Sequence, residues 1–356
     1  MLPEAGTQYY VSTTGSDGAD GLSRATAFRT VAKAYATMTS GDAVLLLPGT
    51  YIHNPDPYVP LIPPAGTITQ GCGIDVTIIR ASPAFQRPVV RPTSSCRFVD
   101  LTIDCDDTAG SFAVGGSSAD VGSFVDVLFE RVKISRGADV IVSLDQDNFR
   151  SMRFEDCEVE ATWDGVSLFD TPCDVEFYRC TLHSTVNAAQ NSARMLFIVS
   201  TGARMRVRCF DCVVFGFTAS PNTSSKADPI WILGENAEVH LVDSSVLSAA
   251  PNGAQAVDLT VNSGNLTVSN NTLFNVAKVA GTILYAPTDF EAAGLIEAGL
   301  TTQQANRLIS SFAAGKLSGV GTGTLDYRNA VDGSKVRMQV TVDTSGNRTA
   351  IDYILT

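Results

Sequence analysis

The chain has 356 residues, of which 44% are hydrophobic and only 17% are charged, and its formal net charge is −12. This apolar content is enough for a sizeable core, which excludes wholesale disorder. The acidic excess argues against nucleic acid as a partner, since that binding depends on clustered lysine and arginine, and no apolar run reaches the ~18 residues of a membrane helix.

The N-terminal segment has the pattern of a cap followed by a first strand. Residues 28–38 place four large side chains on one helical stripe, which predicts a short helix. The stripe consists of Phe28, Val31, Tyr35 and Met38. A Gly41-Asp42 turn then leads into an apolar strand over residues 43–47. The first residues lack the basic and apolar regions of a secretion signal, so we expect no such signal.

One short pattern recurs between about residues 96 and 275. It consists of an apolar or small residue, a second one three positions later, and a third one five positions after the first. Its seven occurrences begin at Phe98, Phe129, Phe154, Phe177, Cys209, Leu241 and Val268. Successive starts lie between 23 residues (Phe154 to Phe177) and 32 residues (Phe177 to Cys209) apart.

The recurring segments indicate a β-solenoid. They are rich in Phe, Val, Leu and Thr with alternating character, which is typical of strands, and clusters of Gly, Asn, Asp and Ser separate them. No helical pattern lies between them, so they are not strand–helix–strand units. An antiparallel sandwich is the alternative, but it does not need the same motif each time. A parallel β-helix does, because equivalent positions stack ~4.8 Å apart on successive coils.

Stacking of equivalent positions predicts two columns inside the β-helix. The first carries Phe98, Phe129, Phe154 and Phe177, and the second carries Cys157, Cys180, Cys212, Ser244 and Asn271. The columns account for several of the eight cysteines as small buried residues, so we expect structural thiols and no metal. Disulfides remain an alternative, and so does half of a zinc site at Cys209-x-x-Cys212, although the chain has only three histidines.

Five short motifs mark the N-terminal segment. They are Tyr10-Val11-Ser12, Gly15-Ser16-Asp17-Gly18, Phe28-Arg29-Thr30-Val31, Gly41-Asp42 and Pro48-Gly49-Thr50-Tyr51. Together they resemble the opening of pectate-lyase-like right-handed parallel β-helix proteins, over about residues 9–51, and the repeat extends the similarity to about residue 275. The resemblance implies an all-β fold, a right-handed parallel β-helix with an N-terminal capping helix. The resemblance does not indicate which activity the protein has, since that superfamily includes lyases, hydrolases, epimerases, phage tailspikes and non-enzymatic shafts.

The segment after the repeat carries start and stop signals for two helices. The start signals are the capping boxes Thr288-x-x-Glu291 and Thr301-x-x-Gln304, and the stop signals are Gly299 and Gly315. An apolar face on the second helix is formed by Ala305, Leu308, Ile309 and Phe312. We expect a short helical pair here, and an unstructured linker is the alternative.

The C-terminal residues predict a small β module. Three short strands, TGTLDYRNA, KVRMQVTVD and RTAIDYILT, are separated by turns at Asp332-Gly333 and Ser345-Gly346-Asn347. So short a segment cannot form its own core, so we expect it to dock on a neighbour or to trimerise. The docking residues expected are Leu308, Ile309, Phe312, Val336, Met338 and Val340. Residues 321–351 also resemble C-terminal segments of tailed-phage virion proteins.

These signals divide the chain into four segments. They are a cap and first coil over residues 1–52, the parallel β-helix over 53–286, a helical hairpin over 287–318, and the C-terminal β module over 319–356.

Evidence for an active site is weak in the sequence. Glycan cleavage needs two carboxylates ~5–9.5 Å apart. Candidate acids are Asp104, Asp106, Asp107, Asp145, Asp147, Asp164 and Asp170, and the fallback catalytic residues among them are Asp106, Asp107 and Asp164. Asp106-Asp107 resembles the paired aspartates of polygalacturonases, but that family's Asn-Thr-Asp, Gly-His-Gly and Arg-Ile-Lys motifs are not found. Aspartates also suit coil turns, so we expect these acids to be structural. Trp163 and Trp231 either line a sugar site or lie at the edge of the core.

These observations favour a non-enzymatic virion structural protein of a tailed phage. We expect a homotrimeric decoration or minor capsid protein that contacts the major capsid protein and needs no cofactor. A tailspike normally carries an anchoring domain before its β-helix, whereas this β-helix begins near residue 9, which favours the phage head. The alternative is a tailspike or a polysaccharide lyase, glycoside hydrolase or binding protein that acts on host surface glycan. A third hypothesis is an exported bacterial adhesin.

Overall fold

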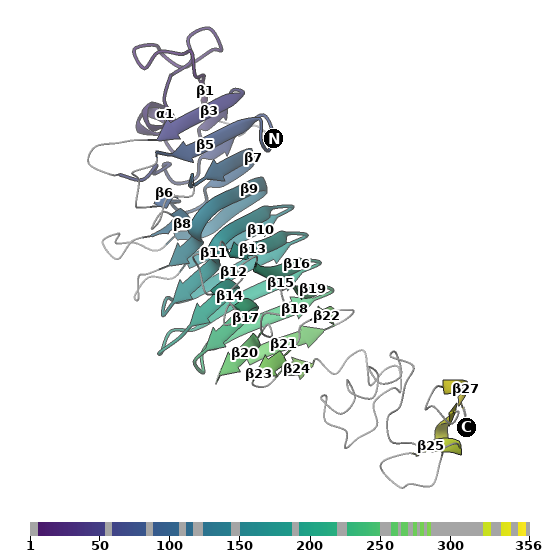
Figure 1. Ribbon diagram of the computed structural model, residues 1–356. Coiled ribbons are helices and arrows are strands. Elements are labelled where there is room, and N and C mark those ends of the chain that lie inside the picture. Colours follow the sequence, from purple (N-terminus) through teal and green to yellow (C-terminus); the bar gives the residue numbers. More distant parts are fainter. Residues whose placement is uncertain are drawn as a thin grey trace. The chain divides into compact units, whose positions relative to one another are not determined.

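The computed structural model describes residues 6–53, 59–82, 88–106, 112–116, 124–143, 150–186, 192–218, 226–249, 258–262, 265–269, 273–275, 278–280, 283–285, 323–328, 336–342 and 348–353. The chain divides into two compact units, Met1–Leu284 and Tyr285–Thr356. The first unit is a parallel β-sheet wound into successive coils, which confirms the predicted all-β parallel fold (Figure 1). Within the described residues, no helix is long and apolar enough to cross a membrane.

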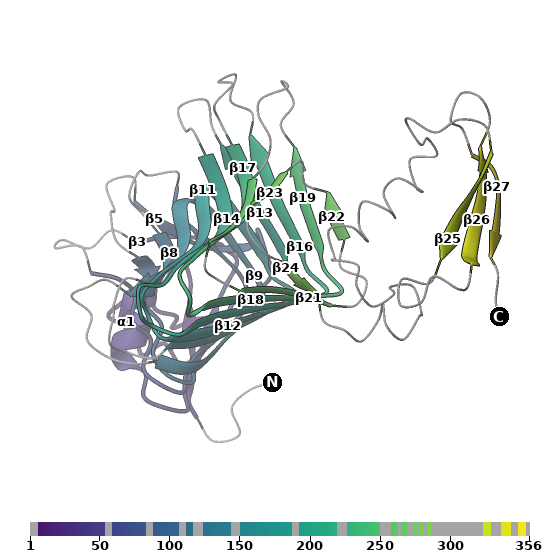
Figure 2. The same ribbon diagram turned by 90° about the horizontal axis from the view of Figure 1, so that it is seen from below.

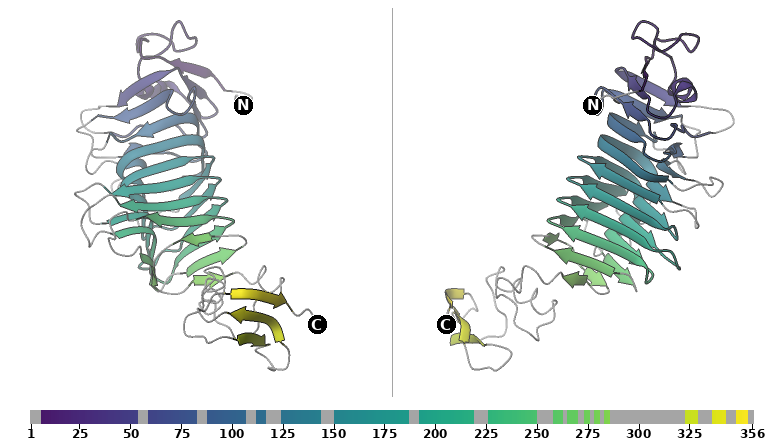
Figure 3. Two further views of the ribbon diagram at one scale, coloured as in Figure 1. Left: turned by 45° about the vertical axis from the view of Figure 1, so that its right-hand side comes forward. Right: turned by 180° about the vertical axis from the view of Figure 1, so that it is seen from behind.

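Three columns of parallel strands form the faces of the β-helix, and successive coils add a strand to each face (Figure 3). The first face contains β1 (Gln8–Val11), β2 (Ala43–Leu46), β4 (Ile68–Gln70), the starts of β7 (Arg97–Asp104) and β9 (Phe124–Ser143), β10 (Arg150–Glu155), β12 (Cys173–Tyr178), β15 (Met205–Phe210), β18 (Ala237–Val242), β21 (Asn265–Ser269) and β24 (Ile283–Tyr285).

The other two faces share the long strands with the first. The second face contains β3 (Gly49–His53), β5 (Thr77–Ala81), the end of β7, the middle of β9, the start of β11 (Glu158–Phe169), β13 (Thr181–Val186), β16 (Val213–Thr218), β19 (Ser245–Ala249) and β22 (Leu273–Asn275). The third face contains β6 (Pro88–Val90), β8 (Phe112–Gly116), the ends of β9 and β11, β14 (Ser192–Val199), β17 (Lys226–Leu233), β20 (Asp258–Asn262) and β23 (Lys278–Ala280). Figure 2, seen from below, shows how the strands of successive coils lie over one another.

Left-handed residues form the corner between the first and second faces. The φ angles of these corner residues lie between 49° and 55°; the residues are Asp100, Arg131, Asp156, Arg179, Asp211 and Asp243. Along a regular strand, residues two apart share a side. The left-handed residue shifts this alternation by one position, so that Phe154 and Cys157, three apart, are both buried on either side of Asp156. The corner conformation therefore explains the spacing of the sequence repeat.

Aspartate and arginine alternate along this corner from Asp100 to Asp211. The left-handed conformation costs most residues roughly 1–2 kcal/mol, and aspartate tolerates it better than arginine. The two corner arginines each bind the aspartate of the preceding coil, Arg131 to Asp100 at 2.6 Å and Arg179 to Asp156 at 2.7 Å. Ion pairs between coils thus accompany the two least favourable residues of the corner.

The phenylalanines of the repeat form a continuous stack in the core. The ladder pairs Phe98 with Phe129, Phe129 with Phe154, and Phe154 with Phe177. Their ring centroids lie 4.9, 4.6 and 4.8 Å apart, with interplanar angles of 8°, 6° and 15°. All four rings are fully buried. On later coils the same column continues through Cys209, Leu241 and Val268.

The cysteines of the second column form a hydrogen-bonded ladder. The backbone N–H of Cys157 donates to Cys180 Sγ, and that of Cys180 donates to Cys212 Sγ, both at 3.4 Å. The N–H of Cys212 donates to Ser244 Oγ at 3.1 Å, so a hydroxyl continues the column. Asn271 lies outside the described residues. The structure has all eight cysteines as free thiols, and all but Cys72 are buried.

The N-terminal helix is shorter than its apolar stripe predicted. Helix α1 spans Val31–Thr37, and the N-cap Thr30 accepts a hydrogen bond from the N–H of Lys33. Phe28 lies before the helix and pairs with Val11, because Asp17 accepts the backbone N–H groups of Arg29 and Thr30 and holds this segment extended. At the other end, Met38 is the C-cap and is still buried.

The second unit contains a three-stranded antiparallel sheet. Its strands are β25 (Gly323–Arg328), β26 (Val336–Val342) and β27 (Arg348–Tyr353), with β26 in the centre. Met338 and Val340 lie two apart on β26 and pair with Tyr327 and Leu325 of β25, whereas a shift in the register separates Val336 from Met338. The predicted helical pair, with Leu308, Ile309 and Phe312, lies outside the described residues.

Candidate functional site

Two of the candidate acids lie in an arginine network at the corner after the second face. Asp104, which is 3% exposed, accepts Arg136 Nε at 2.8 Å and Arg80 Nε at 2.9 Å. Asp106 is a left-handed turn residue with φ of 58°, and its Oδ1 accepts Arg136 at 2.9 Å. Burial works against the charge of Asp104, but the bonds from Arg136 and from the N–H of Asp106 outweigh it and lower the pKa of that carboxyl. Asp107 lies outside the described residues.

Asp164 lies on the third face, in a different setting. It is 4% exposed, and Arg194 on the next coil donates to its two carboxylate oxygens at 2.8 and 2.5 Å. Burial raises the pKa of Asp164, and the bonds from Arg194 offset this only in part. Asp106 follows β7 and Asp164 lies on β11, two coils further along. The two aspartates lie on different faces and are bound by different arginines, Arg136 and Arg194, so the structure does not bring them together as a pair.

The strand register gives Asp164 another acidic neighbour. Asp139 on β9 is its ladder partner on the preceding coil, while Arg194 is its partner on the following one. Directly paired parallel strands lie about 4.8 Å apart, so the two aspartates start from backbone positions within reach of a catalytic pair's spacing. Sequence reasoning missed Asp139 because its alignment with Asp164 depends on how β9 and β11 bend around the corners.

Aromatic side chains lie beside Asp164 on the same face. We call Phe169, Phe197 and Trp231 the aromatic row; all three are half-buried. The guanidinium carbon of Arg194 lies 3.6 Å from the ring centroid of Phe197 and 5.5 Å from that of Trp231. Phe197 meets Phe169 and Trp231 edge-on at 5.2 and 6.1 Å. A partly exposed aromatic surface with one arginine and one buried carboxyl suits contact with a sugar chain. Of the two tryptophans, only Trp231 belongs to this row, and the side chain of Trp163 is not described.

A shallow cavity of about 500 Å³ lies on the outer side of the first face. Its charged lining residues are Asp126, Arg153, Glu155, Asp174, Glu176 and Arg208. All but Asp126 form ion pairs with one another: Arg208 reaches both Asp174 and Glu176 at 2.8 Å, and Arg153 reaches Glu155 at 2.6 Å. Such compensated charges favour a stabilising role over acid–base chemistry.

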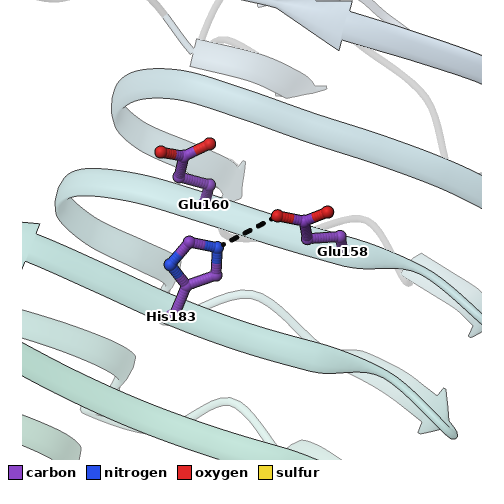
Figure 4. Close-up of side chains that lie close together, drawn as sticks. All are labelled: Glu158, Glu160 and His183. Carbon is purple, nitrogen blue, oxygen red and sulfur yellow. Dashed lines mark hydrogen bonds and ion pairs between the residues drawn. The ribbon is translucent and has the colours of Figure 1, made fainter. Parts of the chain in front are cut away.

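The second face carries a cluster that the sequence did not indicate. Figure 4 shows Glu158 and Glu160 on β11 next to His183 on β13. His183 Nε2 lies 3.3 Å from Glu158 Oε1. Lys133 Nζ on β9 lies 3.3 Å from Glu158 Oε1 and 3.7 Å from Glu160 Oε2. Partial burial opposes the charge of Lys133, but attraction to the two glutamates outweighs it and raises the pKa of that ammonium.

Comparisons with known proteins find similar solved structures and no family. No family model matches the chain, and no curated protein matches it in sequence. Pectin methylesterase PemA from Erwinia chrysanthemi is 13% identical with a TM-score of 0.49, over 83% of this chain and 96% of that one. Pectate lyase Pel9A is 15% identical with a TM-score of 0.45, over 80% of each chain.

A phage protein is among the similar structures. Full-length tailspike protein 2 from the Escherichia coli O157:H7 bacteriophage CAB120 is 11% identical with a TM-score of 0.45. The match covers 72% of this chain and 38% of the tailspike. At such low identities, none of these proteins transfers its activity to this chain.

Proposed function

We propose that the chain is a non-enzymatic structural protein of a tailed-phage virion, a homotrimeric β-helix decoration or minor capsid protein exposed on the particle. The proposal rests on how the candidate catalytic aspartates are bound. Each fallback catalytic acid within the described residues is bound by an arginine of another coil, Asp106 by Arg136 and Asp164 by Arg194. Acids held in this way tie coils together, which favours a durable rod over a reactive groove.

The C-terminal unit supports the same proposal. It contains a three-stranded sheet, which is too small to form an independent core. Another surface must therefore cover one of its sides, and we propose that identical copies from two further chains supply it. The resemblance of residues 321–351 to C-terminal segments of tailed-phage virion proteins favours this choice.

Solution mass tests the trimer. Light scattering on the full-length chain should give about three times its 37.7 kDa, and a variant that ends at residue 284 should be monomeric. A trimer that survives the truncation would assign assembly to the β-helix. A full-length monomer would contradict self-trimerisation.

Comparison of virions tests the location. Cryo-electron microscopy of wild-type particles and of particles lacking the gene should differ by a β-helix-shaped density on the head. Density on the tail alone would overturn the capsid assignment, and no difference at all would overturn the virion proposal.

A glycan-binding or glycan-degrading role is the second candidate, and the aromatic row favours it. Arg194 and Asp164 add a cation and a buried acid with a raised pKa next to partly exposed rings, and Asp139 is the ladder neighbour of that acid. This combination could bind a sugar ring and, with two carboxyls, cleave a glycosidic bond.

Host polysaccharide tests this second candidate. Binding should weaken in Trp231→Ala and persist in Phe210→Ala, a control ring that lies on the outer side of the first face. Release of reducing ends that disappears in Asp164→Asn and in Asp139→Asn would make the chain an enzyme. Release that persists in both variants would exclude this site as its source.

A further inference from the structure

The strongest unassigned feature is the cluster of metal-ligand side chains on the second face. One donor atom each from Glu158, Glu160 and His183 lies within 4.8 Å of the other two. Residues two apart on a strand share a side, so both glutamates project outward together from β11. His183 is the ladder partner of Glu160 on the next coil, which brings the imidazole beside the two carboxylates (Figure 4).

The separation of these donor atoms is close to that around a bound metal. Zinc binds imidazole nitrogen and carboxylate oxygen at about 2.0–2.2 Å, which places two tetrahedral ligands roughly 3.4 Å apart. His183 Nε2 and Glu158 Oε1 are already 3.3 Å apart. The carboxylate of Glu160 is 31% exposed and completes the set within 4.8 Å.

The two glutamates already share one cationic partner. The ammonium of Lys133 lies 3.3 Å from Glu158 Oε1 and 3.7 Å from Glu160 Oε2. The two carboxylates therefore already bind one positive charge at this position. Lysine ends in a compact charge on a flexible four-carbon stem, so the ammonium can swing out when a divalent ion enters.

We propose that Glu158, Glu160 and His183 form a binding site for a divalent transition metal, with Zn²⁺ the best-suited ion. One imidazole and two carboxylates match the ligands that zinc takes, whereas calcium takes six to eight oxygens. The ion would replace the ammonium of Lys133 and bind β11 and β13 at once. Bound there, it links two successive coils and adds to the stability of the β-helix.

The test uses the full chain without a histidine tag, in a Cys72→Ser background that removes the exposed thiol as a competing ligand. Calorimetric titration with ZnCl₂ should show one saturable site per chain, and zinc should raise the melting temperature. His183→Ala should lower the affinity at least ~10-fold, since one of three ligands is lost. Lys133→Met should bind zinc more tightly, because the competing ammonium is gone.

A matched control separates this site from ordinary surface binding. His240 Nε2 lies 3.6 Å from Glu238 Oε2 on the first face, where Arg204 and Arg206 already bind that carboxylate. His240→Ala should therefore leave zinc affinity unchanged. Absence of saturable binding, equal affinity in His183→Ala, or an equal loss in His240→Ala would each overturn the proposal. Circular dichroism of every variant shows that a lost affinity does not come from unfolding.

Discussion

Replacing Phe154 with alanine should strongly destabilise the β-helix, because this ring lies within the phenylalanine stack. Phe129 and Phe177 stack on its two sides at 4.6 and 4.8 Å, and the ring is fully buried. A buried phenylalanine truncated to alanine costs about 3–5 kcal/mol, which includes the cavity left behind. The neighbouring rings are held by the strand ladder and cannot move in to fill the space, so we expect a value near the upper limit.

Two further variants separate the stacking from the burial. Phe154→Leu keeps most of the apolar volume but loses two ring contacts worth about 0.5–1.5 kcal/mol each, so a cost of roughly 1–3 kcal/mol is expected. Phe210→Ala is the control, because this half-buried ring stacks on Tyr178, at 4.6 Å, outside the core. It should cost about 1 kcal/mol.

Urea unfolding followed by both tryptophan fluorescence and circular dichroism measures these differences. The two signals must coincide, since stacked coils can unfold in stages and a single free energy then has no meaning. A Phe154→Ala variant that loses no more stability than Phe210→Ala would refute the argument that the inner stack holds the coils in place. A leucine variant as stable as the wild type would assign the whole effect to burial.

Three other perturbations test the ion pairs and the corners. Arg194→Met leaves the buried Asp164 carboxylate unpaired and should cost about 3–5 kcal/mol, and adding Asp164→Asn should recover part of that loss in urea unfolding. The pKa of Asp104 is lowered in the folded state, so the ionised carboxylate stabilises the fold above its ordinary pKa of 3.8, and this stabilisation is lost as the pH falls through the folded-state pKa. The free energy of unfolding should therefore decrease less steeply with falling pH in Asp104→Asn. Asp156→Ala places alanine at a φ of 53° and should be about 1 kcal/mol less stable than Asp156→Gly, since both lose the ion pair with Arg179 but only alanine is strained; equal melting temperatures would contradict this.

The repeat could be predicted because its cause is local. A left-handed corner such as Asp156 puts Phe154 and Cys157 on the same side of the chain, and stacking then demands the same residues on the next coil. Both requirements act over a few neighbouring positions, so they leave a visible pattern. The start of α1 could not be predicted as closely. The backbone N–H groups of Arg29 and Thr30 donate to Asp17, which lies in a loop twelve or more residues earlier, and these bonds keep the segment before Val31 out of the helix.

The candidate sites depended on alignments between coils. His183 lies beside Glu160 because β11 and β13 stack in one register, although 23 residues separate the two in the chain. Arg194 meets Asp164 through the register of β11 with β14, across loops of unequal length. A shift of one residue in either ladder would turn these side chains to the opposite side of the strand.

The sequence by itself determined the architecture of this protein: the parallel coils, the inner columns from Phe98 onward, and the small antiparallel sheet at the C-terminus. The tertiary structure decided which polar side chains meet on the outer faces. The inner columns must match on every coil to fill the core, so they recur in the chain and can be recognised. The outer positions meet water and need not repeat, so their partners follow from the register and corners of the folded chain.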